Sequence, residues 1–388
     1  AIVNGILNKY LGKESEVIIP ENVRVIGTHA FAEANHVTSI TIPDTVEKIE
    51  DQIMVNSFAH NYGTCLEKLI IGNGVTSIGD EAFTNCEKLT EVKFGTGLKE
   101  LGGRAFTNCE NLKDIDLSET SLTEIKQEAF SGCSNVKKLI LPEKVETIGR
   151  NAFYNVPLNV VNLPKTVKKV ECSAFSNASE LVVYDTIDPQ AVEAEKWKYG
   201  KYGSINSTLA CAMLDYPLRC DEMACNAEWH DYHLTVLSAE TGDIKYRIFC
   251  DSEESEEYRV MMFSAWGKYA SFMFNAYDKY FLKATNMVGR IEMAFCRIQY
   301  PGGLSAANRK NYEAFFERCM YIERSATRTA EVIAKDDAVE RLEILDRYKA
   351  IDAHNIMWIK KIMFSNKALK CLEYLKNHYA NLGGKENG

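Results

Sequence analysis

Apolar and polar positions alternate in short runs through the first half of the chain. One run stops at Pro or Gly, as in Ile40-Thr41-Ile42-Pro43, and a second short apolar run follows it, as in residues 75–78. Alternation with a period of two predicts short β-strands, and the Pro or Gly predicts a bend after each run. Each recurrence of the pattern therefore predicts one coil of chain that contains two short strands.

An aromatic residue after a small one marks the recurrence. Seven such residues lie 22 to 27 positions apart: Phe31, Phe58, Phe83, Phe106, Phe130, Phe153 and Phe175. A period of this size is typical of stacked repeats, in which each unit buries its apolar face against its neighbours. We therefore expect about seven coils around an internal row of Phe. Three thiols at repeat spacing, Cys86, Cys109 and Cys133, are expected to pack beside that row rather than to bind metal.

The wording of the repeats resembles a known family. Around Phe83, Phe106, Phe130 and Phe153 it reads approximately I-x-I-P-x-x-V-x-x-I-G-x-x-A-F-x-x-C-x-x-L, which is similar to the BspA-like, or treponemal-type, leucine-rich repeat. The resemblance runs from about residue 17 to residue 184, and the copy QIMVNSFAHNYGTC departs from it. It implies a curved, right-handed solenoid that binds proteins or other macromolecules through its strand face and has no enzymatic activity.

The candidate binding site consists of exposed positions on the predicted strands. A row of different side chains on a rigid backbone can recognise a partner with little ordering cost. A sheet face must expose something in any case, so the helical tail and the junction before it stay open as alternative sites. The candidate residues are Thr41, Lys68, Ile70, Glu91, Lys93, Asp114, Asp116, Lys138, Ile140 and Asn162.

Two further segments follow the repeats. Residues 185–250 are expected to cap the last coil and to link it onward, because the end of a repeat stack needs a cover. Within them, the run HLTVLSAETGDIKYRIFC predicts a β-hairpin with Gly242 in the turn. From about Tyr258 the apolar period changes to about 3.6, which predicts helices. PGGLS breaks this series, and Ser305 is a candidate N-cap for the helix that follows.

The last helices are predicted at residues 338–348, 355–363 and 367–379. They resemble ankyrin-type helix pairs without the Thr-Pro-Leu-His phrase. Residues 246 to 379 resemble a helical region of unknown function that follows such repeats in Firmicute proteins. The predicted fold class is α/β in the repeats and α+β overall, with a solenoid at 1–184, a cap and linker at 185–250 and a helical, ankyrin-like domain at 251–388.

Net charge and cysteine content limit which kinds of partner and which cellular location the sequence favours. A net charge of −9 argues against nucleic acid, and the sequence contains no apolar stretch long enough to span a membrane. The 12 Cys lack paired spacing, which favours free thiols and a cytoplasmic protein. Many relatives of this repeat class are surface or secreted proteins, which leaves that alternative open. The first residues show no signal-peptide pattern, so a leader has been removed or was never present.

The sequence contains few candidate metal-binding or catalytic residues. The best metal candidates are Cys220, Cys225, His230 and His233, but structural zinc sites favour other spacings, so we expect packed Cys and surface His. Motifs of nucleophilic, metalloprotease or nucleotide sites do not occur. The sequence therefore predicts a non-enzymatic interaction or scaffold protein with protein partners and no cofactor. The alternatives are an adhesin that binds extracellular macromolecules, and an enzyme or zinc-binding activity in the C-terminal half.

Overall fold

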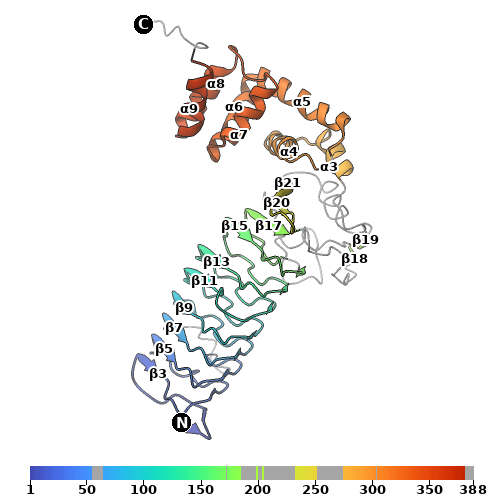
Figure 1. Cartoon of the computed structure of the whole chain (residues 1–388). Helices are drawn as coiled ribbons and strands as arrows, with labels where there is room; N and C mark the ends of the chain where they lie inside the picture. The colour runs from blue at the N-terminus through green and yellow to red at the C-terminus, as the bar shows by residue number, and fades with distance from the viewer. Residues whose placement is uncertain are drawn as a thin grey trace, which may run out of the picture. The chain divides into compact units, whose positions relative to one another are not determined.

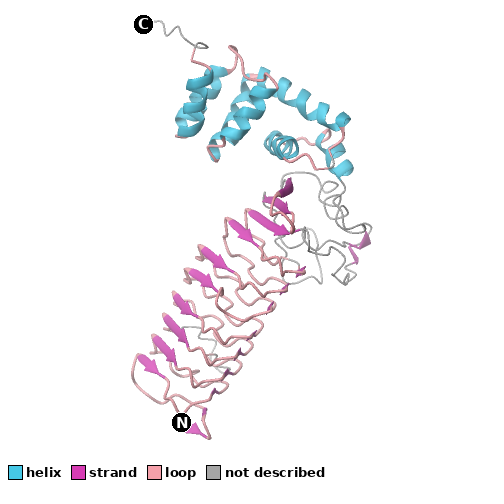
Figure 2. Cartoon of the chain, viewed as in Figure 1, coloured by secondary structure: helices cyan, strands magenta, loops and turns pink. Residues whose placement is uncertain are grey.

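The chain forms two compact units. The computed structural model describes residues 1–54, 64–171, 173–184, 198–199, 203–204, 232–250, 274–302 and 304–380. The first unit, called the repeat unit here, contains the strands before residue 185 (Figure 1). The second, called the helical unit, contains all the described helices together with residues 233–236 and 243–250 (Figure 2).

Each repeat contributes a strand to a first stack of parallel strands. The strands pair in register as three hydrogen-bonded groups, of which the first contains four strands. Their middle residues point into the core, as Ile40, Leu69 and Ile115 do, because side chains alternate along a strand. The strands are β3 (Glu16–Ile18), β5 (Ser39–Ile42), β7 (Lys68–Ile71), β9 (Glu91–Lys93), β11 (Asp114–Asp116), β13 (Lys138–Ile140), β15 (Val160–Asn162) and β17 (Glu180–Tyr184).

A second stack runs along another side of the repeats. It starts with the antiparallel pair β1 (Ile2–Val3) and β2 (Ile6–Leu7), and β2 then pairs in parallel with β4. The other strands are β4 (Val25–Ile26), β6 (Lys48–Ile49), β8 (Ser77–Ile78), β10 (Glu100–Leu101), β12 (Glu124–Ile125), β14 (Thr147–Ile148) and β16 (Lys169–Val170).

These second strands are shorter than the sequence pattern predicts. The expected extended runs began at Val46, Val75 and Val145, but the strands begin two residues later. The Val46 amide donates to the Pro43 carbonyl at 3.2 Å, and the Val145 amide donates to the Pro142 carbonyl at 3.1 Å. Each valine therefore closes a β-turn with its amide while its buried side chain continues the apolar pattern.

The predicted row of Phe residues forms the core of the repeats. Rings of Phe83, Phe106, Phe130, Phe153 and Phe175 stack with centroid separations of 5.1, 5.4, 5.6 and 5.3 Å. All five side chains are fully buried. Burial and near-parallel stacking together explain why the Phe recurs at each coil. The second repeat's Phe58 lies outside the described residues.

The repeat cysteines pack beside this row, as expected. Cys86, Cys109 and Cys133 are fully buried, and the thiols of the last two donate to the Phe83 and Phe106 carbonyls at 3.4 and 3.3 Å. Burial raises the pKa of the Cys86 thiol to about 12. A thiol held neutral in this way is a poor nucleophile and a poor metal ligand. The cysteines are therefore packing residues.

The segment after each Gly forms a tight turn. Residues in the left-handed region recur there at repeat spacing, with φ of 57° at Arg104, 56° at Glu128 and 54° at Asn151. A second left-handed position follows Phe at Asn108 and Gly132. Asn and Gly tolerate this conformation better than other residues, which explains their place in the repeat wording.

The hairpin and the capped helix appear where the sequence predicts them. Strands β20 (Tyr232–Leu237) and β21 (Ile244–Cys250) are neighbours in a sheet, and Gly242 lies between them with φ of 79°. The Ser305 hydroxyl accepts from the Asn308 amide at 3.1 Å, which caps the helix after PGGLS. Both predictions are therefore confirmed. The expected helix start near Tyr258 lies outside the described residues.

Seven described helices make up the rest of the helical unit, and the last three match the predicted positions within a few residues. Helix α6 packs against α8, and α9 packs against α7 and α8. The helices are α3 (Phe274–Phe281), α4 (Met287–Gln299), α5 (Ala306–Tyr321), α6 (Glu323–Lys335), α7 (Val339–Arg347), α8 (Ile356–Ser365) and α9 (Leu369–His378).

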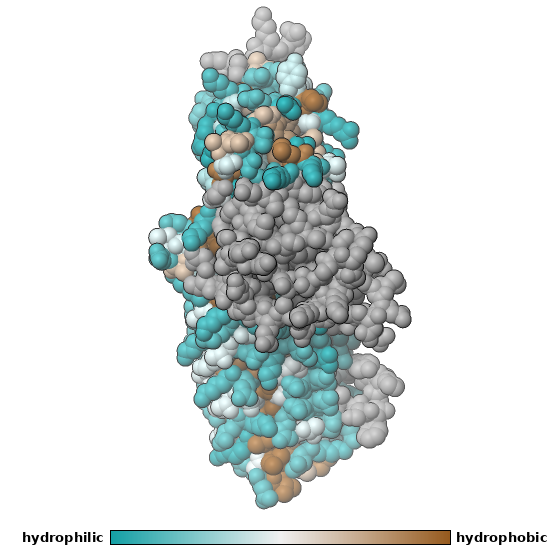
Figure 3. Space-filling model, turned by 90° about the vertical axis from the view of Figure 1, so that its right-hand side faces the viewer, coloured by the Kyte–Doolittle hydropathy of each residue, from teal (hydrophilic) through white to brown (hydrophobic). Residues whose placement is uncertain are grey.

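The surface is largely hydrophilic on the side of the repeats that Figure 3 shows, with apolar side chains gathered toward the N-terminal end. Exposed apolar residues at that end include Val3, Leu11 and Ile18. In the part of the chain that the structure describes, every helix is too short or too polar to cross a membrane.

Candidate functional site

The structure brings the ten candidate residues together in two rows on the first strand stack. In one row, Thr41 is the register partner of Ile70, and Ile70 is the partner of Lys93. The same row continues on later strands with the pair Asp116 and Ile140, and with Asn162 on β15. Register partners on adjacent strands lie about 4.8 Å apart, so their side chains are direct neighbours.

The other row contains charged residues. Lys68 is the register partner of Glu91, and Asp114 is the partner of Lys138. The Lys68 Nζ lies 3.3 Å from a Glu91 carboxylate oxygen. The row thus contains two pairs of opposite charge, with the acidic residues Glu91 and Asp114 in the middle, although exposed pairs of this kind contribute little stability. The two rows together are called the strand face below.

Exposure along the strand face differs from residue to residue. Lys93, Asp116, Lys138 and most other charged members are exposed, whereas the isoleucines Ile70 and Ile140 are half-buried. The Asp116 carboxylate accepts from the Ser118 amide at 3.1 Å and from its hydroxyl at 2.7 Å, which fixes its direction. The strand face therefore presents exposed charged side chains next to half-buried isoleucines.

Two apolar members of the rows were missed by the sequence reasoning. Ile18 is the register partner of Thr41 and is 75% exposed, and Val160 occupies the equivalent place in the charged row and is 46% exposed. Aligning Pro20 with Pro43 would have placed Ile18 in the row, because both prolines end the same strand of the repeat. The strand face is therefore longer, and more apolar at its ends, than predicted.

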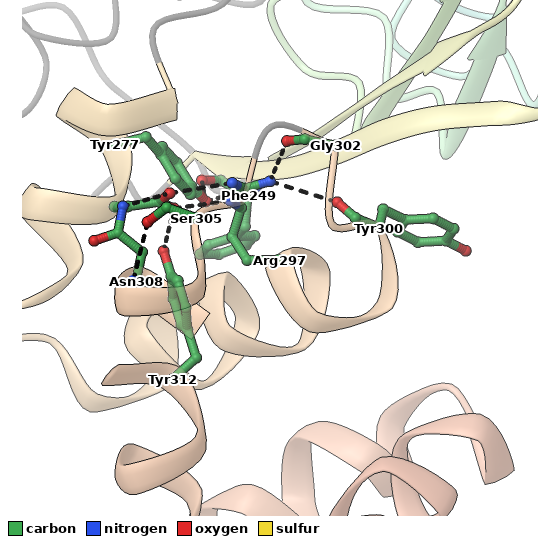
Figure 4. A network of polar contacts seen from close by, with 9 residues as sticks. Phe249, Tyr277, Arg297, Tyr300, Gly302, Ser305, Asn308 and Tyr312 are labelled. Atoms are coloured by element: carbon green, nitrogen blue, oxygen red, sulfur yellow. Dashed lines mark hydrogen bonds and ion pairs between the residues drawn. The ribbon is translucent and has the colours of Figure 1, made fainter. Parts of the chain in front are cut away.

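A second polar cluster lies in the helical unit and includes Arg297, Asn308 and Tyr312 (Figure 4), which all donate to the carboxylate of Asp278. This carboxylate accepts from Arg297 at 2.8 and 3.1 Å, from the Tyr312 hydroxyl at 2.7 Å and from the Asn308 amide at 3.2 Å. The Arg297 guanidinium also donates to the Gly302 carbonyl at 3.0 Å. Burial, followed by the charge of Asp278, raises the pKa of Tyr312 above its ordinary value.

This cluster has the properties of a structural network. Asp278 and Arg297 have no solvent-exposed side-chain surface, and each bonds to several partners. A buried ion pair that is fully hydrogen-bonded can hold a chain reversal in place, here the turn after α4. No feature of the sequence pointed to Asp278 and Arg297 as partners.

Of the four metal candidates chosen from the sequence, the structure describes only His233. Cys220, Cys225 and His230 lie outside the described residues. His233 lies on β20, and its neighbours are Glu292 and Cys296 of α4, which the sequence reasoning did not select. Their spacing of four on a helix places both on one face, but nothing in the sequence connects that face to His233.

The Glu292 carboxylate lies between two basic side chains. Both oxygens of Glu292 accept from the Arg341 guanidinium, at 3.2 and 2.8 Å, and one of them lies 3.4 Å from the His233 Nε2. Burial alone would raise the pKa of Glu292, but the neighbouring His233 and Arg341 outweigh it and lower the pKa to about 2. The group combines nitrogen, oxygen and sulfur atoms that can serve as metal ligands.

Comparison with known families identifies the repeats. Residues 9–61 and 53–182 match the family described as BspA type Leucine rich repeat region, in six copies. The count is one fewer than the seven that we inferred from Phe spacing. Residues 9–182 therefore contain BspA-type leucine-rich repeats, as the sequence predicted. No curated protein matches the chain.

Several solved bacterial structures are similar to part of the chain. A leucine rich cell surface protein from Faecalibacterium prausnitzii is 26% identical over 47% of this chain and 51% of its own, with a TM-score of 0.40. A leucine-rich repeat protein from Bacteroides ovatus is 25% identical over 45% of this chain and 51% of its own, with a TM-score of 0.34. One from Eubacterium ventriosum is 24% identical over 45% of this chain and 47% of its own, with a TM-score of 0.40. The match thus spans about half the length of these relatives.

Proposed function

We propose that the BspA-type leucine-rich repeats form a right-handed solenoid whose strand face binds a protein partner, and that the chain acts as a non-enzymatic interaction or scaffold protein. The observation that carries this proposal is the in-register arrangement of different exposed side chains, such as Lys93, Asp116 and Lys138, on paired strands. Since the backbone hydrogen bonds already fix these strands, a partner would not have to order them on binding.

The size of the strand face limits what it can do alone. Eight strands at about 4.8 Å, each three residues long at about 3.3 Å per residue, give a sheet face of about 400 Å². A stable interface buries about 800 Å² per partner. The strand face can therefore supply the centre of an interface, and loops beside the strands must supply its rim.

The charges favour a protein over a nucleic acid as partner. The net charge is −9, and the strand face carries both acidic and basic side chains. A nucleic acid would require a basic surface to neutralise its phosphates. A protein with a complementary pattern of charges fits this mixture of acidic and basic side chains better.

Affinity capture from the native cell with matched variants tests the proposal. The face variant reverses three charges of the strand face, with Lys93→Glu, Asp116→Lys and Lys138→Glu. The control variant makes the same charge changes beside the second strand stack, at the exposed residues Lys99, Glu124 and Lys126. We expect wild type and the control variant to capture the same protein, and the face variant to lose it. Equal capture by all three would refute the proposed site.

A second proposal concerns the helical unit. We propose that it consists of ankyrin-like helix pairs, α6 with α7 and α8 with α9, and that it begins near residue 251 after a cap and linker at 185–250. Left-handed residues, Asp337 and Lys367, join the helices of each pair, and an Ala follows each of them. The contacts of α6 with α8 and of α7 with α9 fit the stacking of two such pairs. If the face variant keeps its partner, this unit becomes the next candidate.

The location of the protein remains a proposal with two alternatives. Because many proteins with this class of repeat are surface or secreted, the family match favours the extracellular alternative over the cytoplasm that the unpaired cysteines suggested. An adhesin that binds extracellular macromolecules would use the same strand face. Protease treatment of intact cells, followed by detection of the chain, distinguishes the two, because only a surface protein is cleaved.

A further inference from the structure

Three metal-ligating side chains converge within the helical unit. His233 approaches from strand β20, whereas Glu292 and Cys296 lie four residues apart on helix α4 and share one of its faces. One ligand atom from each lies within 4.8 Å of the other two. The side chains of His233 and Glu292 are 17% and 9% exposed, and Cys296 is 2% exposed. The cluster is therefore almost closed to solvent.

The His233 Nε2 atom faces the Glu292 carboxylate without a well-aligned hydrogen bond to it. Within the described residues, the His233 Nε2 is buried and has no hydrogen-bond partner, although it lies 3.4 Å from the Glu292 carboxylate. A buried polar atom without a partner costs about 1–3 kcal/mol. A cation between the nitrogen and the carboxylate oxygen would satisfy both atoms.

The separation of these atoms suits one ion. Two ligand atoms held about 2.05 Å from zinc at the tetrahedral angle lie about 3.3 Å apart. The observed distance from the His233 Nε2 to the Glu292 oxygen is 3.4 Å. The Cys296 sulfur lies within 4.8 Å of the other two ligand atoms, and a change in its side-chain position would bring it to the distance of about 2.3 Å that zinc requires.

The charges around the cluster make the Cys296 thiolate a necessary ligand for a divalent cation. Arg341 donates to both Glu292 oxygens, at 3.2 and 2.8 Å, and so orients the carboxylate. Its positive charge also opposes a divalent cation nearby. The negative charge of the Cys296 thiolate, added to that of Glu292, is needed to offset the cation. A mixed nitrogen, oxygen and sulfur set is typical of zinc rather than of calcium or magnesium, which prefer oxygen.

We propose that His233, Glu292 and Cys296 bind one zinc ion and that, within the helical unit, this ion ties the β20 residue His233 to helix α4. A fourth coordination position is left for water. The site is independent of the strand face, and it differs from the Cys220, Cys225 and His230 set that the sequence suggested around His233.

The test uses the full chain without a tag, stripped with a chelator, reloaded with zinc and dialysed. Elemental analysis should find one zinc per chain in wild type. The variants Cys296→Ser and His233→Gln should each lose at least tenfold in zinc affinity, because even loss of a supporting residue costs about 10- to 100-fold. The matched control is Cys319→Ser, which changes another buried thiol of the helical unit and should bind as wild type does.

The cobalt spectrum of wild type provides a readout that does not depend on whether a variant folds. Wild type loaded with Co²⁺ should show a thiolate-to-cobalt charge-transfer band and the strong visible bands of a tetrahedral ion. The charge-transfer band should be absent from Cys296→Ser and present in Cys319→Ser. Zinc should also raise the thermal midpoint of the helical signal in wild type, since a ligand that binds only the folded state stabilises it.

Three outcomes would overturn the site. Wild type that holds no stoichiometric zinc after reloading excludes it. Zinc held with unchanged affinity by both Cys296→Ser and His233→Gln places the metal elsewhere. A cobalt complex of wild type without a thiolate band excludes Cys296 as a ligand even if both variants fail to fold.

Discussion

Replacement of Phe106 tests whether the aromatic row holds the repeats together. Its ring is fully buried and lies 5.1 Å from that of Phe83 and 5.4 Å from that of Phe130, with Phe94 edge-on at 5.5 Å. Truncation of a buried Phe to Ala costs about 3–5 kcal/mol. Phe106→Leu keeps most of the buried apolar surface and loses the ring contacts, each worth about 0.5–1.5 kcal/mol, so it should cost about 2 kcal/mol.

Hydrogen exchange measures this loss in the repeats separately from the helices. The Phe83 amide donates to the Ala105 carbonyl of the next coil, and the Phe130 amide donates to the Ala152 carbonyl, both at 2.8 Å. A loss of about 4 kcal/mol should accelerate exchange at these amides about 10³-fold, and Phe106→Leu should fall between this and wild type.

An exposed aromatic of the helical unit serves as the control. Phe364 is 77% exposed, so Phe364→Ala should change stability by less than about 0.5 kcal/mol. The reasoning is refuted if Phe106→Ala accelerates the two amides less than tenfold, or if Phe364→Ala accelerates them equally.

Two further predictions concern the helical unit. Asp278→Asn leaves the buried Arg297 without its counter-charge and should lower the free energy of unfolding, measured by urea titration, by about 3–5 kcal/mol. Tyr312→Phe removes only one hydrogen bond to Asp278 and should lower it by about 1–2 kcal/mol. Equal losses in the two variants would contradict the central role of the Asp278–Arg297 pair. Asp337→Ala removes the acceptor of two α9 amides, at 3.0 and 2.9 Å, and should cost about 1 kcal/mol at neutral pH. Burial favours a higher pKa for Asp337, but bonds from the backbone of Cys371 and Lys370 lower it, so its contribution is full above pH 3.8 and is lost in acid. A cost that stays constant as the pH falls would argue against this cap.

The repeats could be predicted because their information is local. Each coil carries its own strand, bend and Phe, and copies such as those around Phe83 and Phe106 confirm one another. The same logic placed the strand face, since equivalent positions of successive coils become register partners. Where the prediction erred, at Val46 and its equivalents, an apolar residue serves a turn and the core together, and alternation alone cannot separate the two.

The polar clusters of the helical unit could not be predicted in this way. Helix positions and the Ser305 cap follow from periodicity and local bonds, but the pairing of Asp278 with Arg297 depends on how helices pack. His233 was selected for its cysteine neighbours in sequence, whereas its neighbours in the fold come from α4. Contacts between segments that are distant in the chain produce no periodic pattern, so they cannot be inferred from one sequence.

The most direct test of the central claim is the affinity of the captured partner for three purified proteins, measured by calorimetry: wild type, the face variant and the control variant. Reversal of Lys93, Asp116 and Lys138 places like charges opposite the partner's own, which costs several kcal/mol at an interface. We predict that the face variant binds at least 100-fold more weakly and that the control variant binds within threefold of wild type. Equal affinity of all three proteins would contradict binding through the strand face.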